Sequence, residues 1–192
     1  ITTKIVMLTK NKAKKIFIFQ QRNWCLRIGH DLAKHFVKMG NEVSCLTFRK
    51  DIFNFITKQK DVKYNLILNH DDIIQNPEKY IKKKISTEEL CKNLNLRSIW
   101  PLAQSLRDHA KSYKKKYFYS FQQNRSDEEI INYFKALYFV LKTIKREFNP
   151  NVILMPNYVS GVHQLFYYFA KTNNIRTIAV TSQLIEKRNF FT

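Results

Sequence analysis

The sequence is poor in the residues that break a chain or cross-link it. Its 192 residues include three glycines and four prolines, which argues against a turn-rich β-sandwich and against a low-complexity chain. The three cysteines, Cys25, Cys45 and Cys91, are widely spaced and form no C-x-x-C pair. A sparse, odd number of cysteines fits a reducing compartment better than a disulfide framework, so we expect a cytoplasmic protein.

Long apolar runs are also missing. None approaches the roughly 20 residues that a membrane-spanning helix requires. Residues 1–19 have lysines on both sides of their apolar run and no small-residue cleavage site, so they do not resemble a signal peptide. Hydrophobic residues nevertheless make up 44% of the chain and aromatic residues 14%, which is enough for a sizeable buried core.

Acidic residues are scarce. The 34 Lys and Arg outnumber the 15 Asp and Glu, giving a formal net charge of +19 at pH 7. Such a charge favours association with nucleic acid, anionic lipid or an acidic substrate. The chain is also rich in Lys, Asn, Ile, Phe and Tyr, the amino acids of AT-rich codons, so codon bias is an alternative source of the charge.

A first βαβ block is predicted within residues 13–68. Residues 14–20 are aromatic and β-branched and predict a buried strand. A stripe of Ile28, Leu32, Phe36 and Met39 then predicts a helix, which Gly40 closes before a second strand at 42–48 and a third at 64–68. Because a helix connects the first two strands, we expect them to be parallel and adjacent.

A second block is predicted within residues 126–180. The run from Ser126 to Glu129 is typical of a capping box and begins a long amphipathic helix. The wholly apolar residues 152–155 predict a buried strand, followed by a helix at 160–172 and a strand at 175–180. Residues 69–124 are interpreted as a variable, partly helical insertion. The predicted fold is a single α/β domain with a Rossmann-like parallel sheet flanked by helices.

Two segments follow strands of the predicted parallel sheet, where ligands usually bind. The first is residues 20–30, interpreted as a long loop. Arg22 and Arg27 can pair with phosphate or carboxylate, Trp24 can stack on a sugar ring, and Asn23 and Gly29 complete the candidate site. The alternative is that Trp24 fills the core while the arginines are solvated. The absence of G-x-G-x-x-G disfavours a dinucleotide cofactor.

The second segment is residues 156–163. Asn157, Ser160 and His163 can all form hydrogen bonds, and Gly161 would let a ligand approach the backbone. The alternative makes Ser160 a helix N-cap and His163 a partly exposed helix residue.

Two residues are candidates for a catalytic base. Asp108, in an Arg-Asp-His trio on a predicted helix, can accept a proton from a sugar hydroxyl, and His30 is its rival. The alternative for Asp108 is a surface salt bridge. The five histidines show neither HExxH nor another metal-ligand spacing, so no metal site is expected.

The layout resembles the N-terminal domain of GT-B glycosyltransferases, in particular bacterial capsule and surface-polysaccharide biosynthesis proteins of the cell envelope. The similarity lies in the strand at 15–19, the Gly-His pair at 29–30 that opens a helix, and the G-N-E-V turn at 40–43. The N-P-N-V-I-L run at 149–154 and the strand at 175–180 resemble later strands of that family.

The resemblance implies an acceptor-side domain that works with a C-terminal, donor-binding domain absent from these residues. The reaction would transfer a sugar from a nucleotide sugar to a surface polysaccharide or lipid-linked glycan, without a cofactor, and this half alone would be inactive. A basic face would suit peripheral contact with an anionic inner membrane. The base would be His30 or Asp108, and the acceptor would be held by Arg22, Asn23, Trp24, Arg27, Gly29, Asn157, Ser160, Gly161 and His163. Alternatives are a basic nucleic-acid-binding α/β module, with nucleic acid the less favoured partner, and a sugar-nucleotide epimerase of similar architecture.

Overall fold

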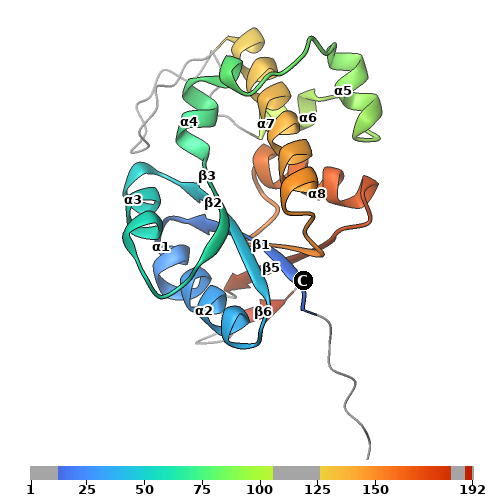
Figure 1. Cartoon of the computed structure of the whole chain (residues 1–192). Coiled ribbons are helices and arrows are strands. Elements are labelled where there is room, and N and C mark those ends of the chain that lie inside the picture. The colour runs from blue at the N-terminus through green and yellow to red at the C-terminus, as the bar shows by residue number, and fades with distance from the viewer. Residues whose placement is uncertain (1–12, 106–125, 183–188, 192) are drawn as a thin grey trace, which may run out of the picture.

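A sheet with the strand order β3-β2-β1-β4-β5-β6 organises the computed structural model, which describes residues 13–105, 126–182 and 189–191 (Figure 1). The first five strands of that order are mutually parallel, and β6 runs antiparallel to β5. This confirms the predicted α/β, Rossmann-like class and the two parallel crossovers in one sheet. The strands are β1 (Lys15–Gln21), β2 (Glu42–Phe48), β3 (Tyr64–Asn69), β4 (Val152–Met155), β5 (Arg176–Ser182) and β6 (Asn189–Phe191).

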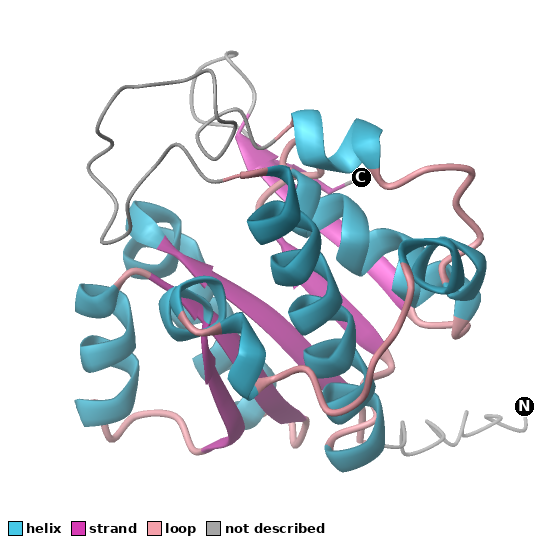
Figure 2. Ribbon diagram, turned by 90° about the horizontal axis from the view of Figure 1, so that it is seen from above, coloured by secondary structure: helices cyan, strands magenta, loops and turns pink. Residues whose placement is uncertain are grey.

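Helices cover both faces of the sheet (Figure 2). One face packs against α2 and α3, and the other packs against α4, α5, α6, α7 and α8. The helical elements are α1 (Arg22–Trp24), the π-helical segment η1 (Cys25–Gly29), α2 (His30–Lys38), α3 (Lys50–Lys58), α4 (His70–Gln75), the 3-10 turn η2 (Pro77–Lys79), α5 (Thr87–Asn93), α6 (Trp100–Gln104), α7 (Asp127–Glu147) and α8 (Gly161–Thr172). Within the described ranges, no helix is both long and apolar enough to cross a membrane.

Strand β1 is buried on both faces of the sheet. Successive side chains along it point alternately to one face and the other, and a separate hydrophobic cluster covers each face. Phe17 and Phe19 pack towards α8, where Phe19 meets the ring of Phe166 edge-on at 4.7 Å. Ile16 and Ile18 point to the other face and pack with α2. The alternation of β1 therefore decides which helices each of its residues can contact.

The long helix α7 begins as the sequence predicts. The backbone N–H of Glu129 donates to Ser126 Oγ at 3.2 Å, and the N–H of Ser126 donates to Glu129 Oε2 at 2.6 Å. This reciprocal pair satisfies two of the donors that a helix start leaves unpaired. The capping box thus fixes where α7 begins.

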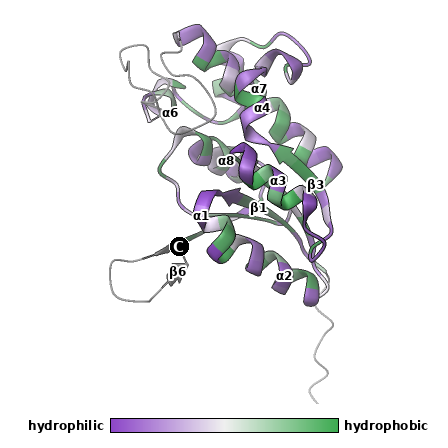
Figure 3. Cartoon of the chain, turned by 90° about the vertical axis from the view of Figure 1, so that its left-hand side faces the viewer, coloured by the Kyte–Doolittle hydropathy of each residue, from purple (hydrophilic) through white to green (hydrophobic). Residues whose placement is uncertain are grey.

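The interpretation of residues 20–30 as a loop is wrong. Strand β1 runs directly into α1, η1 and α2, so the segment is helical from Arg22 onward. Trp24 and Ile28 pack in the same cluster as Leu32 and Phe36, which extends the helical stripe by one position, Trp24, towards the N-terminus. Met39, which the predicted stripe includes, is 64% exposed. The difference between the buried and solvent sides of α2 is visible in Figure 3.

Gly161 marks a close approach between two helices. A Cβ atom at this position would lie 2.4 Å from the Leu102 carbonyl oxygen of α6 and 3.0 Å from Phe134 Cζ of α7. Contacts this short cannot be made without moving the backbone. Glycine is therefore required at the start of α8 for α6 to pack there.

We predict that Gly161→Ala lowers the free energy of unfolding by about 1–3 kcal/mol, the usual range for overpacking a tight site. Urea denaturation followed by circular dichroism measures the change. Lys171→Ala on the exposed side of α8 is the matched control and should leave the midpoint unchanged. Equal stability of the Gly161→Ala variant and the wild type would contradict this packing argument.

Candidate functional site

The order of the strands reverses between β1 and β4. The chain proceeds from β1 to β2 on one side and from β4 to β5 on the other, so the carboxyl ends of β1 and β4 form a topological switch point. Ligands of open α/β sheets bind beyond this point. We call the residues at and beyond the ends of the two strands there, Gln21, Arg22, Asn157, Ser160 and His163, the switch-point site.

A chain of hydrogen bonds joins the two sides of the switch-point site. His163 Nε2 lies 3.0 Å from Gln21 Oε1, and His163 Nδ1 lies 2.5 Å from Ser160 Oγ. The side-chain oxygen of Gln21, Oε1, can only accept a hydrogen bond, so His163 carries its proton on Nε2. His163 Nδ1 then accepts a hydrogen bond from the Ser160 hydroxyl. The lone pairs of Ser160 therefore remain able to accept a hydrogen bond from a ligand.

His163 is a buried, neutral group at the centre of this chain. It is 2% exposed, and its ring packs 5.2 Å from Phe19 and 6.3 Å from Phe48. Burial lowers the pKa of His163 from 6.5 to about 4. The alternative that made His163 a partly exposed helix residue is therefore wrong. Ser160 does occupy the N-cap position of α8, but its hydroxyl bonds to His163 and makes no capping hydrogen bond.

Arginines follow two neighbouring strands in a backbone conformation that side chains rarely adopt. Gln21 and Phe48 are partners in the sheet, so Arg22 and Arg49 come next on adjacent strands. Arg22 has φ 45°, and Arg49 has φ 75° with ψ 145°. Such conformations cost about 1–3 kcal/mol each and concentrate at functional sites. Arg49 was not predicted, although a cation immediately after a buried strand was a readable signal.

Polar residues also follow β3, beside Arg49. The Asp71 carboxylate accepts from the backbone N–H of Arg49 at 3.3 Å. His70 stacks on Phe48 at 4.4 Å and bonds through Nε2 to the Tyr133 hydroxyl at 2.6 Å. Sequence reasoning missed these residues because it treated residues 69–124 as a variable insertion. The Asn-His-Asp run directly after the predicted strand was the available signal.

Trp24 and Gly29 contribute to packing in the first predicted segment. Trp24 Nε1 donates to the Val180 carbonyl oxygen at 3.3 Å, which ties α1 to β5. A Cβ at Gly29 would lie 2.4 Å from Gln20 Oε1 and 2.4 Å from Trp24 Cζ3, so glycine is needed where η1 meets β1. Trp24 therefore matches the structural alternative given for it.

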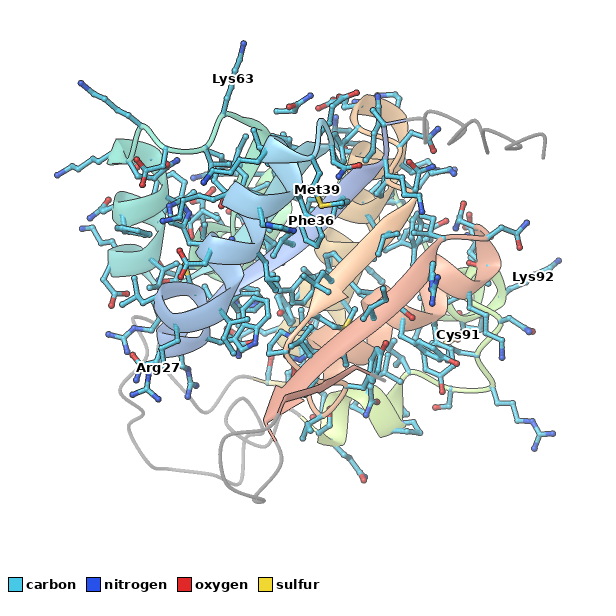
Figure 4. All side chains as sticks on the ribbon, turned by 90° about the horizontal axis from the view of Figure 1, so that it is seen from below. Arg27, Phe36, Met39, Lys63, Cys91 and Lys92 are labelled. Carbon is cyan, nitrogen blue, oxygen red and sulfur yellow. The ribbon has the colours of Figure 1, made fainter. Side chains whose placement is uncertain are left out.

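Asn23 and Arg27 lie on the solvent side of the same segment, and Arg27 projects from its outer surface in Figure 4. In the second segment, Asn157 Oδ1 accepts from the Val159 N–H at 3.1 Å and so shapes the turn between β4 and α8. Gly161 is buried beneath Leu102, so its missing side chain accommodates the chain itself rather than a ligand.

His30, one of the two predicted catalytic residues, does not join the switch-point site. His30 lies on the opposite face of the sheet, where Nδ1 is 3.3 Å from the Tyr64 hydroxyl and Nε2 is 3.8 Å from an Asp61 carboxylate oxygen. The reason is the alternation of β1, because Gln20 bonds to the same Tyr64 hydroxyl whereas Gln21 bonds to His163. Burial lowers the pKa of His30. Asp108 lies outside the described residues.

Within the part of the chain that the structure describes, no group of three or more His, Cys, Asp or Glu is arranged to hold a metal ion. Cys25, Cys45 and Cys91 are buried free thiols. Neither the protein-family models nor the curated proteins compared with this sequence give a match.

We predict that His163 makes stability depend on pH. Its pKa is about 4 in the folded chain, against 6.5 for an unperturbed histidine, so protons bind preferentially to the unfolded chain between these values. Stability is therefore full above pH 6.5 and falls as the pH drops towards 4, with a limiting slope of about 1.4 kcal/mol per pH unit from this group. Denaturant titrations across this window should give a shallower slope for His163→Gln than for the wild type.

His35→Gln is the control, since His35 is exposed on α2, and it should keep the wild-type slope. His30 acts in the same direction as His163, so His30→Gln measures that separate contribution. Identical pH slopes for wild type and His163→Gln would show that His163 is not held neutral by its surroundings.

Proposed function

We propose that this chain is the acceptor-side domain of a glycosyltransferase that transfers a sugar from a nucleotide sugar to a surface polysaccharide or lipid-linked glycan. The observation that carries the proposal is the hydrogen-bond chain Gln21–His163–Ser160 at the switch point of a Rossmann-like sheet. It keeps a fixed acceptor, Ser160 Oγ, on the same side of the sheet as the amide donor of Gln21. Paired donors and acceptors are what a sugar with several hydroxyl groups requires.

The turn after β1 is suited to an acceptor rather than to a dinucleotide. Pyrophosphate binding at this place uses a glycine-rich turn through which the backbone approaches the phosphates. Here the turn is made by Arg22, and the space beside Gly29 is filled by Gln20 and Trp24. The nucleotide sugar would then be held chiefly by a second, C-terminal domain.

Two arginines add recognition of charge: Arg22, which belongs to the switch-point site, and Arg49, which follows the neighbouring strand β2. Arg22 and Arg49 can bind a carboxylate or phosphate on the acceptor through their planar guanidinium groups. Uronic acids and lipid-linked sugar phosphates carry such groups. The proposed acceptor is thus an anionic glycan or glycolipid, in keeping with the net charge of +19.

In the proposed reaction an acceptor hydroxyl attacks the anomeric carbon of the donor sugar and the nucleoside diphosphate leaves. The hydroxyl must give its proton to a base. His30 faces Tyr64 across the sheet from Ser160 and His163, so we favour Asp108 over His30 for this role. Exchanging Asp108 for Asn in the enzyme that holds both domains would remove the base while keeping the shape of the side chain.

Binding to the purified chain tests the proposal. We expect an anionic disaccharide that contains a uronic acid to shift the ¹⁵N-NMR signals of the Gln21 and Asn157 side-chain amides in a saturable manner. Ser160→Ala removes the fixed acceptor and should weaken binding about tenfold, the effect of losing one buried hydrogen bond of about 1.4 kcal/mol. Thr57→Ala, near the C-terminal end of α3 and therefore at the opposite edge of the sheet, is the matched control.

Random single-stranded DNA is titrated in parallel. Tighter binding of DNA than of the disaccharide, with a steep dependence on salt, would favour the nucleic-acid-binding alternative and overturn the proposal. Shifts at Gln21 and Asn157 with free nucleotide sugar but not with the disaccharide would favour the epimerase alternative.

We also predict that Arg49→Gly separates stability from binding. Glycine adopts φ 75° and ψ 145° without a steric penalty, so the variant should be more stable than the wild type by about 1 kcal/mol. The lost ion pair with Asp51 is partly exposed and contributes little. Binding of the anionic disaccharide should weaken, because the guanidinium group is gone.

Asn174→Gly is the control for Arg49→Gly, since Asn174 has φ 54° at the opposite edge of the sheet. This variant should not change binding. If Arg49→Gly binds the disaccharide as the wild type does, Arg49 takes no part in recognition.

A further inference from the structure

A cavity lies at the edge of the sheet opposite the switch-point site. Helices α7 and α8 end just before the parallel strands β4 and β5 begin, so their last turns lie at the amino-terminal edge. The cavity between these turns and α5 has a volume of about 350 Å³. Its lining residues are Asn93, Tyr138, Lys142, Lys145, Arg146, Phe169, Thr172 and Asn173. We call it the amino-edge pocket.

Three cations and no acidic residue line the amino-edge pocket. Arg146 forms an ion pair with Glu147 at 2.6 Å. Over the described residues, neither Lys142 nor Lys145 has a carboxylate within the 4.0 Å of an ion pair. The pocket therefore contains positive charge that the described part of the chain does not neutralise.

The spacing of these cations makes them neighbours on one side of α7. Lys142 lies three residues before Lys145 and four before Arg146, and like charges at these spacings repel each other on a helix. The negative end of the helix dipole offsets part of that repulsion for Lys145 and Arg146 in the last turn. A bound anion would offset the remainder.

The rest of the wall is aromatic and amide in character and is held in place by its own contacts. Lys142 Nζ lies 5.8 Å from the centre of the Tyr138 ring. Asn173 Nδ2 donates to the Phe169 carbonyl oxygen at 2.9 Å. Cations, an aromatic ring and amides that line a cavity of about 350 Å³ match a small anionic ligand.

We propose that the amino-edge pocket binds a phosphoryl group, carried either by a soluble phosphorylated molecule or by a lipid headgroup. Lysine ammonium groups bind phosphate as compact charges, and Arg146 adds planar donors. The pocket and the switch-point site lie at opposite ends of the parallel strands, so this proposal does not depend on the glycosyltransferase assignment.

The test uses the whole chain with two soluble probes, inorganic phosphate and pyrophosphate, and with vesicles of phosphatidylcholine and phosphatidylglycerol. The variant Lys142→Gln/Lys145→Gln should weaken binding at least about tenfold, because it removes two charge-assisted contacts. The control Lys50→Gln/Lys58→Gln removes the same charge from the exposed side of α3 and should bind as the wild type does. The side-chain amide signals of Asn93 and Asn173 in ¹⁵N-NMR locate the ligand.

Selective weakening with the soluble probes, together with shifts at Asn93 and Asn173, supports a pocket for a soluble phosphorylated molecule. Selective weakening with vesicles alone supports a lipid headgroup. Equal weakening in both double variants would mean that the net charge of the chain attracts the probes in general. No binding of any probe would mean that the amino-edge pocket holds no phosphoryl group. Either of the last two results overturns the proposal. Circular dichroism of each variant confirms that it is folded.

Discussion

The two-sided burial of β1 is the constraint on which the rest of this structure depends. A central strand with apolar side chains on both faces requires a helical layer on each side of the sheet. Phe17 and Phe19 are covered by α7 and α8, and Ile18 is covered by α2. Because successive side chains alternate, this arrangement also sends Gln20 and Gln21 to opposite faces. The position of the candidate site follows directly from the alternation in this strand.

Elements with local signals could be predicted from the sequence. The apolar runs of β1 and β4, the capping box of α7 and the Gly40 turn before β2 each depend on residues close together in the chain. The helical segment from Arg22 to Gly29 was missed because polar residues separate its buried positions. Trp24, Ile28, Leu32 and Phe36 repeat every fourth residue, and this repeat was the signal that would have revealed it.

The candidate site was only partly predictable, since it depends on which strands become neighbours. Ser160 and His163 were found because they follow a recognisable strand. Gln21 was not chosen as a ligand-binding residue, and its role appears only when β1 lies beside β4. The position of His30 also depends on tertiary structure, because α2 packs on the face of the sheet opposite to His163, where His30 meets Tyr64.

The positive charge of the chain has two interpretations, codon bias and ligand binding, and composition alone does not separate them. Codon bias adds lysines without regard to cavities or to their neighbours. Ligand binding, in contrast, requires cations that lie together, have no acidic partners and line a cavity. Lys142 and Lys145 meet these conditions beside Tyr138, within the described part of the chain. Lys34 does not, since it pairs with Asp31 at 2.9 Å on an open helix surface. The surroundings of each lysine therefore separate the two interpretations, because ligand binding explains Lys142 and Lys145 whereas codon bias is sufficient for Lys34.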